Sequence, residues 1–179
     1  LEGHVIQDPQ DPALLRHIDG PLCERFRTAV SVVEAHQPAD GAAETLRAAK
    51  RPVIYAGQGV HYAEAWPQLK ELVELRGAPT TTSLEGKSAF PEDHPLSLGS
   101  GGRSLPRTVH EFLQNSDVIF GIGCSFTSTN FGITMPTGKT VIHATLDPID
   151  LNKNVVSQHA LIGDAALTLE ALIAELKTQ

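Results

Sequence analysis

Two short glycine turns are the first features of this sequence that could do chemistry. The turn 57–59 (Gly-Gln-Gly) follows the β-rich apolar stretch 52–56, and the turn 121–123 (Gly-Ile-Gly) ends a second such stretch. Backbone N–H groups at such a turn can bind a pyrophosphate, because only glycine lets the main chain approach it closely. The full dinucleotide fingerprint needs a third glycine, where Tyr62 stands here. The alternative interpretation is a tight turn that only lets elements pack closely, without a ligand.

Two aspartates stand where predicted strands end. Asp147 closes the stretch 140–147 and could accept a hydrogen bond from a ribose hydroxyl. It could equally cap a short helical turn that opens at Pro148, because its carboxylate can accept from free N–H groups. Asp164 follows Gly163 before the closing helix, and there the cap is the favoured interpretation.

Metal and serine-hydrolase chemistry are not indicated. The eight histidines form no HxH or HExxH group, and Cys23 and Cys124 stand far apart with no CxxC spacing. The cysteine usage favours a reducing cytoplasm as the compartment. Ser125 stands in a Gly-Cys-Ser-Phe-Thr segment that resembles a nucleophile elbow only superficially, since Thr127 replaces the glycine that this motif requires.

The charge pattern disfavours two classes of partner. The chain has a formal net charge of −7, and its 14 Lys and Arg residues form no basic block, so a nucleic-acid partner is not expected. Its apolar runs are too short to cross a bilayer, so no membrane role is expected either.

The elements that must position these residues alternate along the chain. Strands are predicted at 50–56, 80–82, 117–123, 140–147 and 160–162, and helices at 21–35, 40–49, 63–76, 108–114 and 165–176. This alternation predicts an α/β fold with a doubly wound, mainly parallel six-stranded sheet and helices on both faces. Crossovers between parallel strands are short and right-handed, which agrees with helices on both faces. The strand at 50–56 is expected to lie centrally.

The domain organisation is predicted as a linker with a connecting helix over residues 1–39 and one α/β domain over residues 40–179. Asp8-Pro9 and Asp11-Pro12 disfavour helix at the start of the chain, which favours an extended linker. The chain opens on Leu1 without a signal-peptide pattern, so we expect a middle domain cut from a longer protein.

Four segments in order resemble one family. The segments are AAKRPVIYAGQGV, GAPTTTSLEGKSAFPEDHPLSLGSGG, SDVIFGIGCSF and HATLDPIDLNKN. Together they resemble the central domain of thiamine-diphosphate-dependent enzymes of the acetolactate synthase type, over about residues 40–177. The resemblance implies a Rossmann-like domain of the FAD/NAD-binding type.

The resemblance also implies that catalysis lies outside this chain. In the family, a glutamate of the amino-terminal pyrimidine-binding domain activates the thiamine, and a GDG-to-Asn segment of the diphosphate-binding domain holds magnesium and the diphosphate. This sequence has no GDG segment. We therefore expect no activity from the chain alone. The parent, a homodimer or homotetramer with these flanking domains, would decarboxylate or ligate 2-oxo acids with thiamine diphosphate and Mg.

Some family members bind FAD or ADP in this domain, and the resemblance carries those contacts to particular positions. They are Gly57, Gln58, Gly59, Thr82, Ser83, Leu84, Gly102, Gly123, Leu146, Asp147, Gly163 and Asp164. Four other positions depart from the flavin-binding pattern: Ser125 replaces an arginine, Gly101 a histidine, Glu85 a methionine and Thr145 the first of two aspartates. Losing a cation and gaining an acid weakens anion binding, so a vestigial site with weak or absent flavin affinity is expected.

Two other functions would suit the same kind of sheet. A stand-alone flavin-binding electron-transfer module would purify as a yellow protein. A sirtuin-type NAD-dependent deacylase needs a catalytic histidine near a TQN-like segment and usually four zinc cysteines, and this sequence contains neither feature.

Overall fold

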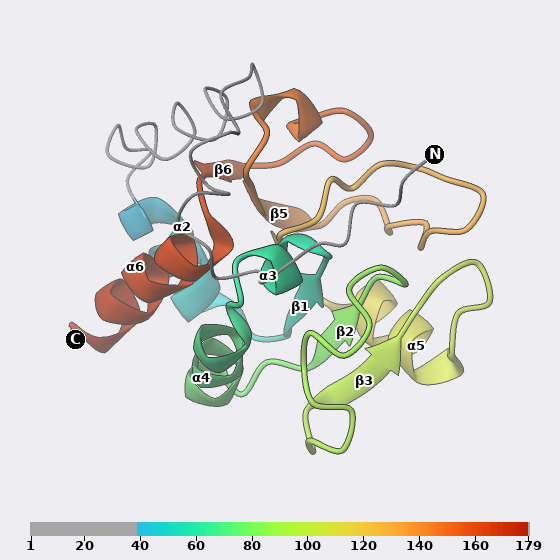
Figure 1. Cartoon of the computed structure of the whole chain (residues 1–179), viewed down its shortest axis with the longest axis horizontal. Coiled ribbons are helices and arrows are strands. Elements are labelled where there is room, and N and C mark those ends of the chain that lie inside the picture. Colours follow the sequence, from blue (N-terminus) through green and yellow to red (C-terminus); the bar gives the residue numbers. More distant parts are fainter. Residues whose placement is uncertain (1–38, 179) are drawn as a thin grey trace, which may run out of the picture.

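The computed structural model describes residues 39–178, which are built around a six-stranded parallel sheet (Figure 1). The strands are β1 (Pro52–Ala56), β2 (Thr80–Thr82), β3 (Ser97–Ser100), β4 (Val118–Ile122), β5 (Thr140–Thr145) and β6 (His159–Ile162). Their order is β3-β2-β1-β4-β5-β6, and every neighbouring pair is parallel. The predicted doubly wound sheet is thus confirmed, with β1 in the interior. The strand order reverses between β1 and β4, where the fold has its switch point.

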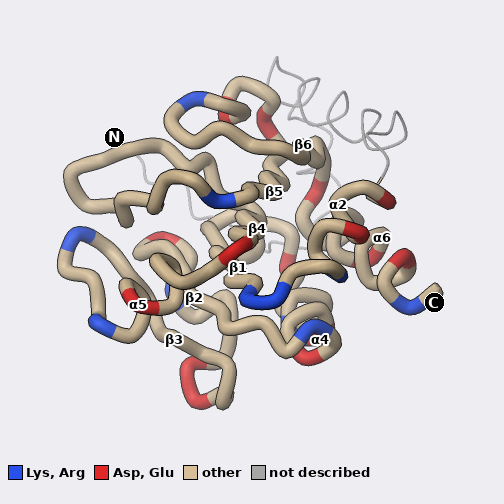
Figure 2. The backbone as a smooth tube through the Cα atoms, turned by 180° about the vertical axis from the view of Figure 1, so that it is seen from behind, with Lys and Arg blue, Asp and Glu red and all other residues tan. Residues whose placement is uncertain are grey.

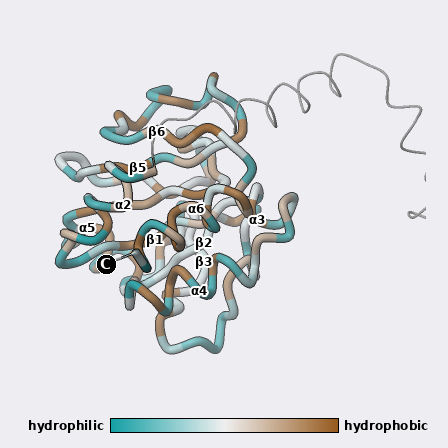
Figure 3. The backbone as a smooth tube through the Cα atoms, turned by 90° about the vertical axis from the view of Figure 1, so that its left-hand side faces the viewer, coloured by the Kyte–Doolittle hydropathy of each residue, from teal (hydrophilic) through white to brown (hydrophobic). Residues whose placement is uncertain are grey.

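Within residues 39–178, four helices pack on one face of the sheet and one helix packs on the other (Figure 1). The first group is α2 (Ala39–Ala48), α3 (Gly59–Tyr62), α4 (Trp66–Arg76) and α6 (Ala165–Lys177), and the single helix is α5 (Arg107–Asn115). Alternation along β1 explains both layers, because successive side chains of a strand point to opposite faces. Ile54 packs in the larger core with α2, α4 and α6, whereas Val53 packs with Val109 and Leu113 of α5. Figure 3 shows hydrophobic residues (brown) along these inner elements and hydrophilic ones (teal) in the outer loops.

The helix ends follow from local chemistry. α4 has Pro67 in its first turn and ends at Gly77, which adopts the left-handed conformation (φ 57°) that glycine tolerates. The predicted helix at 63–76 begins only at Trp66, because Glu64 also has a positive φ (50°) and separates α3 from α4. The predicted helix at 21–35 and the linker lie outside the described residues.

Two features of the sheet were not predicted. β3 (Ser97–Ser100) is the sixth strand, at the edge, and the sequence Ser-Leu-Gly-Ser contains no β-branched or aromatic residue to indicate it. The crossovers from β4 to β5 and from β5 to β6 contain loops and the 3₁₀ turn η2 (Pro148–Asp150) in place of α-helices.

None of the helices within residues 39–178 is long and apolar enough to cross a membrane.

Candidate functional site

The structure brings all twelve predicted contact residues to one edge of the sheet. They are Gly57, Gln58 and Gly59 after β1, Thr82, Ser83 and Leu84 at the end of β2, Gly102 after β3, Gly123 after β4, Leu146 and Asp147 after β5, and Gly163 and Asp164 after β6. Because all six strands are parallel, their carboxyl ends meet at the same edge. Ligands of open α/β sheets bind outside this edge near the switch point. This carboxyl edge is therefore the candidate site.

At the centre of the carboxyl edge the two glycine turns bind each other. The Gly57 amide donates to the Ile122 carbonyl (2.9 Å), and the Gly59 amide donates to the Gly123 carbonyl (2.8 Å). A Cβ on Gly57 would clash with the Gly123 carbonyl oxygen, and one on Gly59 would lie 2.7 Å from the Gly123 Cα. These glycines allow the turns after β1 and β4 to touch. Their amides are already used, so they are not free to donate to a phosphate.

Both aspartates of the carboxyl edge cap helical turns. Asp147 Oδ1 accepts from the Ile149 amide (3.0 Å) at the start of η2. Asp164 Oδ1 accepts from the amides of Ala166 (2.9 Å) and Leu167 (3.2 Å) at the start of α6. The capping interpretation thus describes both side chains in this structure.

The positions that depart from the flavin-binding pattern have local partners. The Ser125 hydroxyl donates to Thr127 Oγ1 (2.8 Å). Gly101 leaves little room for a larger residue, since a Cβ there would lie 2.6 Å from Ile133 Cδ1. Thr145 donates to Asp150 Oδ2 at 3.4 Å, and Glu85 is exposed. Among the described residues, Ser125 offers an anion a hydroxyl group where the flavin-binding pattern has an arginine, and Glu85 adds an acid where the pattern has a methionine.

A buried aromatic cluster lies under the carboxyl edge, and sequence reasoning missed it. Tyr55 of β1 stacks on Phe126 (centroids 5.7 Å apart), and Phe126 forms an edge-to-face pair with His143 of β5 (centroids 4.7 Å apart). Phe126 has a left-handed backbone (φ 49°), which is rare for a bulky residue and is held here by packing on both sides of its ring. The available signal was His143 itself, a histidine in the middle of an apolar strand.

The titratable groups of this cluster are neutral at physiological pH. His143 is fully buried; its Nε2–H donates to the Cys124 carbonyl (2.8 Å), while its Nδ1 has no partner. Burial lowers the pKa of His143, against smaller opposing effects of the Cys124 carbonyl and Asp150. Burial also raises the pKa of the Cys124 thiol to about 12. Cys124 is therefore a poor nucleophile.

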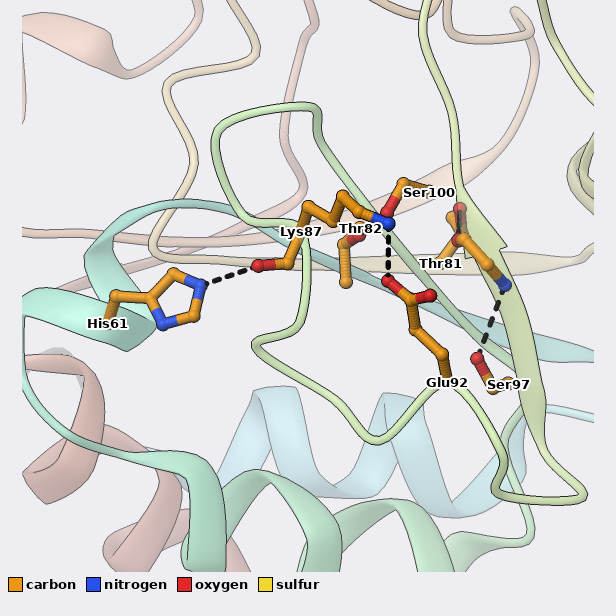
Figure 4. A network of polar contacts seen from close by, with 8 residues as sticks. His61, Thr81, Thr82, Lys87, Glu92, Ser97 and Ser100 are labelled. Atoms are coloured by element: carbon orange, nitrogen blue, oxygen red, sulfur yellow. Dashed lines mark hydrogen bonds and ion pairs between the residues drawn. The ribbon is translucent and has the colours of Figure 1, made fainter.

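One histidine connects the loop after β2 to α3 and α4. The Trp66 indole N–H donates to His61 Nδ1 (2.9 Å). His61 Nε2 donates to the Lys87 carbonyl (2.9 Å), as Figure 4 shows. Lys87 in turn forms an ion pair with Glu92 (2.9 Å). Both nitrogens of His61 are used structurally, which leaves neither for acid–base chemistry. No three His, Cys, Asp or Glu side chains of the described residues gather as they would around a metal ion.

Comparison with known proteins gives the family. The family model described as "Thiamine pyrophosphate enzyme, central domain" matches residues 39–172. The chain belongs to this family of central domains. This result confirms the resemblance inferred from the four sequence segments and does not favour a stand-alone flavin module or a sirtuin-type deacylase.

Relatives and solved structures agree with this family. A probable acetolactate synthase large subunit of Methanococcus aeolicus is 38% identical over 137 residues, which cover 75% of this chain and 23% of the relative. The acetolactate synthase isozyme 3 large subunit of Escherichia coli is 38% identical over 141 residues, 77% of this chain and 24% of that protein. A putative thiamin diphosphate-dependent enzyme of Mycobacterium smegmatis superimposes with a TM-score of 0.65 at 30% identity, covering 79% of this chain and 28% of that one. Benzoylformate decarboxylase of Polynucleobacter necessarius gives a TM-score of 0.65 at 25% identity, covering 79% and 27%. The chain therefore spans about a quarter of the length of these relatives.

Proposed function

We propose that this domain is a scaffold within a longer thiamine-diphosphate-dependent enzyme that decarboxylates or ligates 2-oxo acids, and that it has no activity alone. The match of residues 39–172 to the central-domain family carries the proposal. The carboxyl edge supports the proposed lack of activity of the domain alone. Its aspartates cap helical turns, and its histidine and thiol are buried away from solvent. The described residues at this edge assemble no nucleophile–base pair.

In this proposal, the flanking domains bind the cofactor and the described domain has a structural role. Flanking pyrimidine-binding and diphosphate-binding domains would hold thiamine diphosphate and Mg, and the cofactor would supply the nucleophile for chemistry beside the 2-oxo carbonyl. Residues 1–39 would be the connector from the upstream domain, and the parent would be a homodimer or homotetramer of the cytoplasm. The described domain would contribute a rigid sheet that spaces its neighbours.

We further propose that the carboxyl edge is a vestigial nucleotide site with weak or no affinity for FAD or ADP. The diphosphate of such a ligand does not fit the glycine turns, because the Gly57 and Gly59 amides donate to carbonyls of the neighbouring turn. Ser125 offers the diphosphate no positive charge, and exposed Glu85 repels it. The twelve positions at this edge are where any residual affinity would reside.

An activity assay tests the scaffold proposal. The purified chain is incubated with pyruvate or benzoylformate, with and without thiamine diphosphate and magnesium, and release of carbon dioxide is measured. We expect rates equal to those of a protein-free blank. The control is a longer protein that contains the same domain with its flanking domains, which should show cofactor-dependent turnover. Turnover by the 179-residue chain alone would overturn the proposal.

A further inference from the structure

A cavity of about 350 Å³ lies at the amino-terminal edge of the sheet, opposite to the glycine turns. It forms where the chain enters β1, between the turn that ends α4 and the last turns of α5. The residues that line it include Lys50, Arg51, Val53, Pro79, Glu111 and Phe112. Its volume lies within the range of small-molecule sites.

The charges around this cavity favour an anion. Lys50 and Arg51 are exposed, and within residues 39–178 neither side chain forms an ion pair. Figure 2 shows the basic positions of the described chain (blue) spread among the acidic ones (red). The two nearby acids, Glu111 and Asp117, already have partners. Glu111 pairs with Arg107 (2.6 Å), and Asp117 accepts from the backbone amides of Lys50 (2.7 Å) and Arg51 (2.9 Å).

The main chain that presents the two cations is fixed in place. The hydrogen bonds from the backbone amides of Lys50 and Arg51 to the Asp117 carboxylate hold residues 50 and 51 at the start of β4. The Asp117 amide in turn donates to the Arg51 carbonyl (3.3 Å). A third cation, Lys139, donates to the carbonyls of Gln114 (2.6 Å) and Ser116 (2.9 Å) at the end of α5. Lys139 offsets the negative end of that helix beside the cavity.

Part of the cavity lining is apolar. Phe112 is 42% exposed, which leaves part of its ring in contact with solvent. Pro79 and the buried Val53 also belong to the apolar part of the lining. An aromatic ring that enters the cavity would cover the Phe112 ring and gain both burial and aromatic contact.

We propose that this cavity binds a small organic monocarboxylate with an aromatic body. The carboxylate faces Lys50 and Arg51, where the guanidinium can donate two parallel hydrogen bonds, and the ring lies against Phe112 and Pro79. The site is separate from the carboxyl edge and independent of the function proposed for the parent enzyme.

Titration with benzoate, followed through the amide NMR signals of the full chain, tests this site. We expect saturable shifts at cavity amides such as Gly77 and Asn115, and weaker binding of benzyl alcohol, which keeps the ring without the charge. The double variant Lys50→Gln/Arg51→Gln should lose affinity by about tenfold, because it removes both charged donors. Both side chains are exposed, so the fold should be unaffected.

A matched control separates local from overall charge. The double variant Lys70→Gln/Lys153→Gln changes net charge equally at exposed positions outside the cavity lining and should bind benzoate as the unaltered chain does. The proposal would be overturned by the absence of saturation. It would also be overturned by shifts confined to carboxyl-edge amides such as Gly59 and Gly123, or by equal losses in the two double variants.

Discussion

His143 lies fully buried in β5, so protonation of its ring would place a charge in the core. Its one hydrogen bond uses Nε2, and the unpartnered Nδ1 is the atom that a proton would occupy. Burial therefore lowers the pKa of His143 in the folded chain, while the unfolded chain keeps the ordinary value of 6.5. His143 therefore couples the stability of the domain to pH.

The pH dependence of unfolding follows from this difference. Well above pH 6.5 the ring is neutral in both states and contributes nothing to the slope. As the pH falls below 6.5, His143 is protonated in the unfolded chain but stays neutral in the folded chain, where its pKa is lower. The free energy of unfolding therefore falls by at most about 1.4 kcal/mol per pH unit. Urea unfolding at pH 7, 6 and 5 should show a steeper loss for the unaltered chain than for His143→Phe. His110→Gln, an exposed control in α5, should keep the steep loss, and parallel curves for the unaltered chain and His143→Phe would contradict this account.

At the scale of elements, the contact between the turns after β1 and β4 determines what the carboxyl edge can do. The sequence predicted both turns and their shared edge, since each turn follows an apolar β-rich stretch. It left open whether their glycines bind a ligand or allow close packing. The answer depends on which carbonyls lie opposite the Gly57 and Gly59 amides, and only the folded sheet brings residues 57 and 122 together.

Gly57→Ala tests the close packing of these turns. The new Cβ would meet the Gly123 carbonyl oxygen and the Cys124 Cβ, both of which belong to a fixed backbone turn. Such overpacking should lower the free energy of unfolding by about 1–3 kcal/mol, measured by urea unfolding at pH 7. Gly41→Ala is the matched control: it adds the same methyl in α2 with no contact closer than 3.5 Å, and should stabilise the helix by up to about 1 kcal/mol. Unchanged stability of Gly57→Ala would show that the turns separate easily.

At the scale of the molecule, most of the architecture was predictable from the sequence. β1, β4 and β5 are apolar stretches rich in β-branched residues, and the strong pattern of such strands made a parallel sheet predictable. β3 escaped prediction because its pairing depends on neighbours: Thr81 donates to the Gly99 carbonyl (2.8 Å), and the hydroxyls of Thr82 and Ser100 meet at 2.8 Å. The cavity at the amino-terminal edge was also not predictable from the sequence, because residues 50–53 and residues from 111–115, which are far apart in the chain, line it together.

We propose that this central domain keeps the fold of a nucleotide-binding sheet without a working diphosphate site. Calorimetric titration of FAD into the purified chain tests it most directly. We predict no saturation in the low micromolar range for the unaltered chain, and for Ser125→Arg a gain of about 1–2 kcal/mol where the new guanidinium reaches the phosphate. ADP, which carries the same diphosphate without the flavin, should behave in the same way. Submicromolar binding of FAD by the unaltered chain would contradict the claim and identify the carboxyl edge as a functional flavin site.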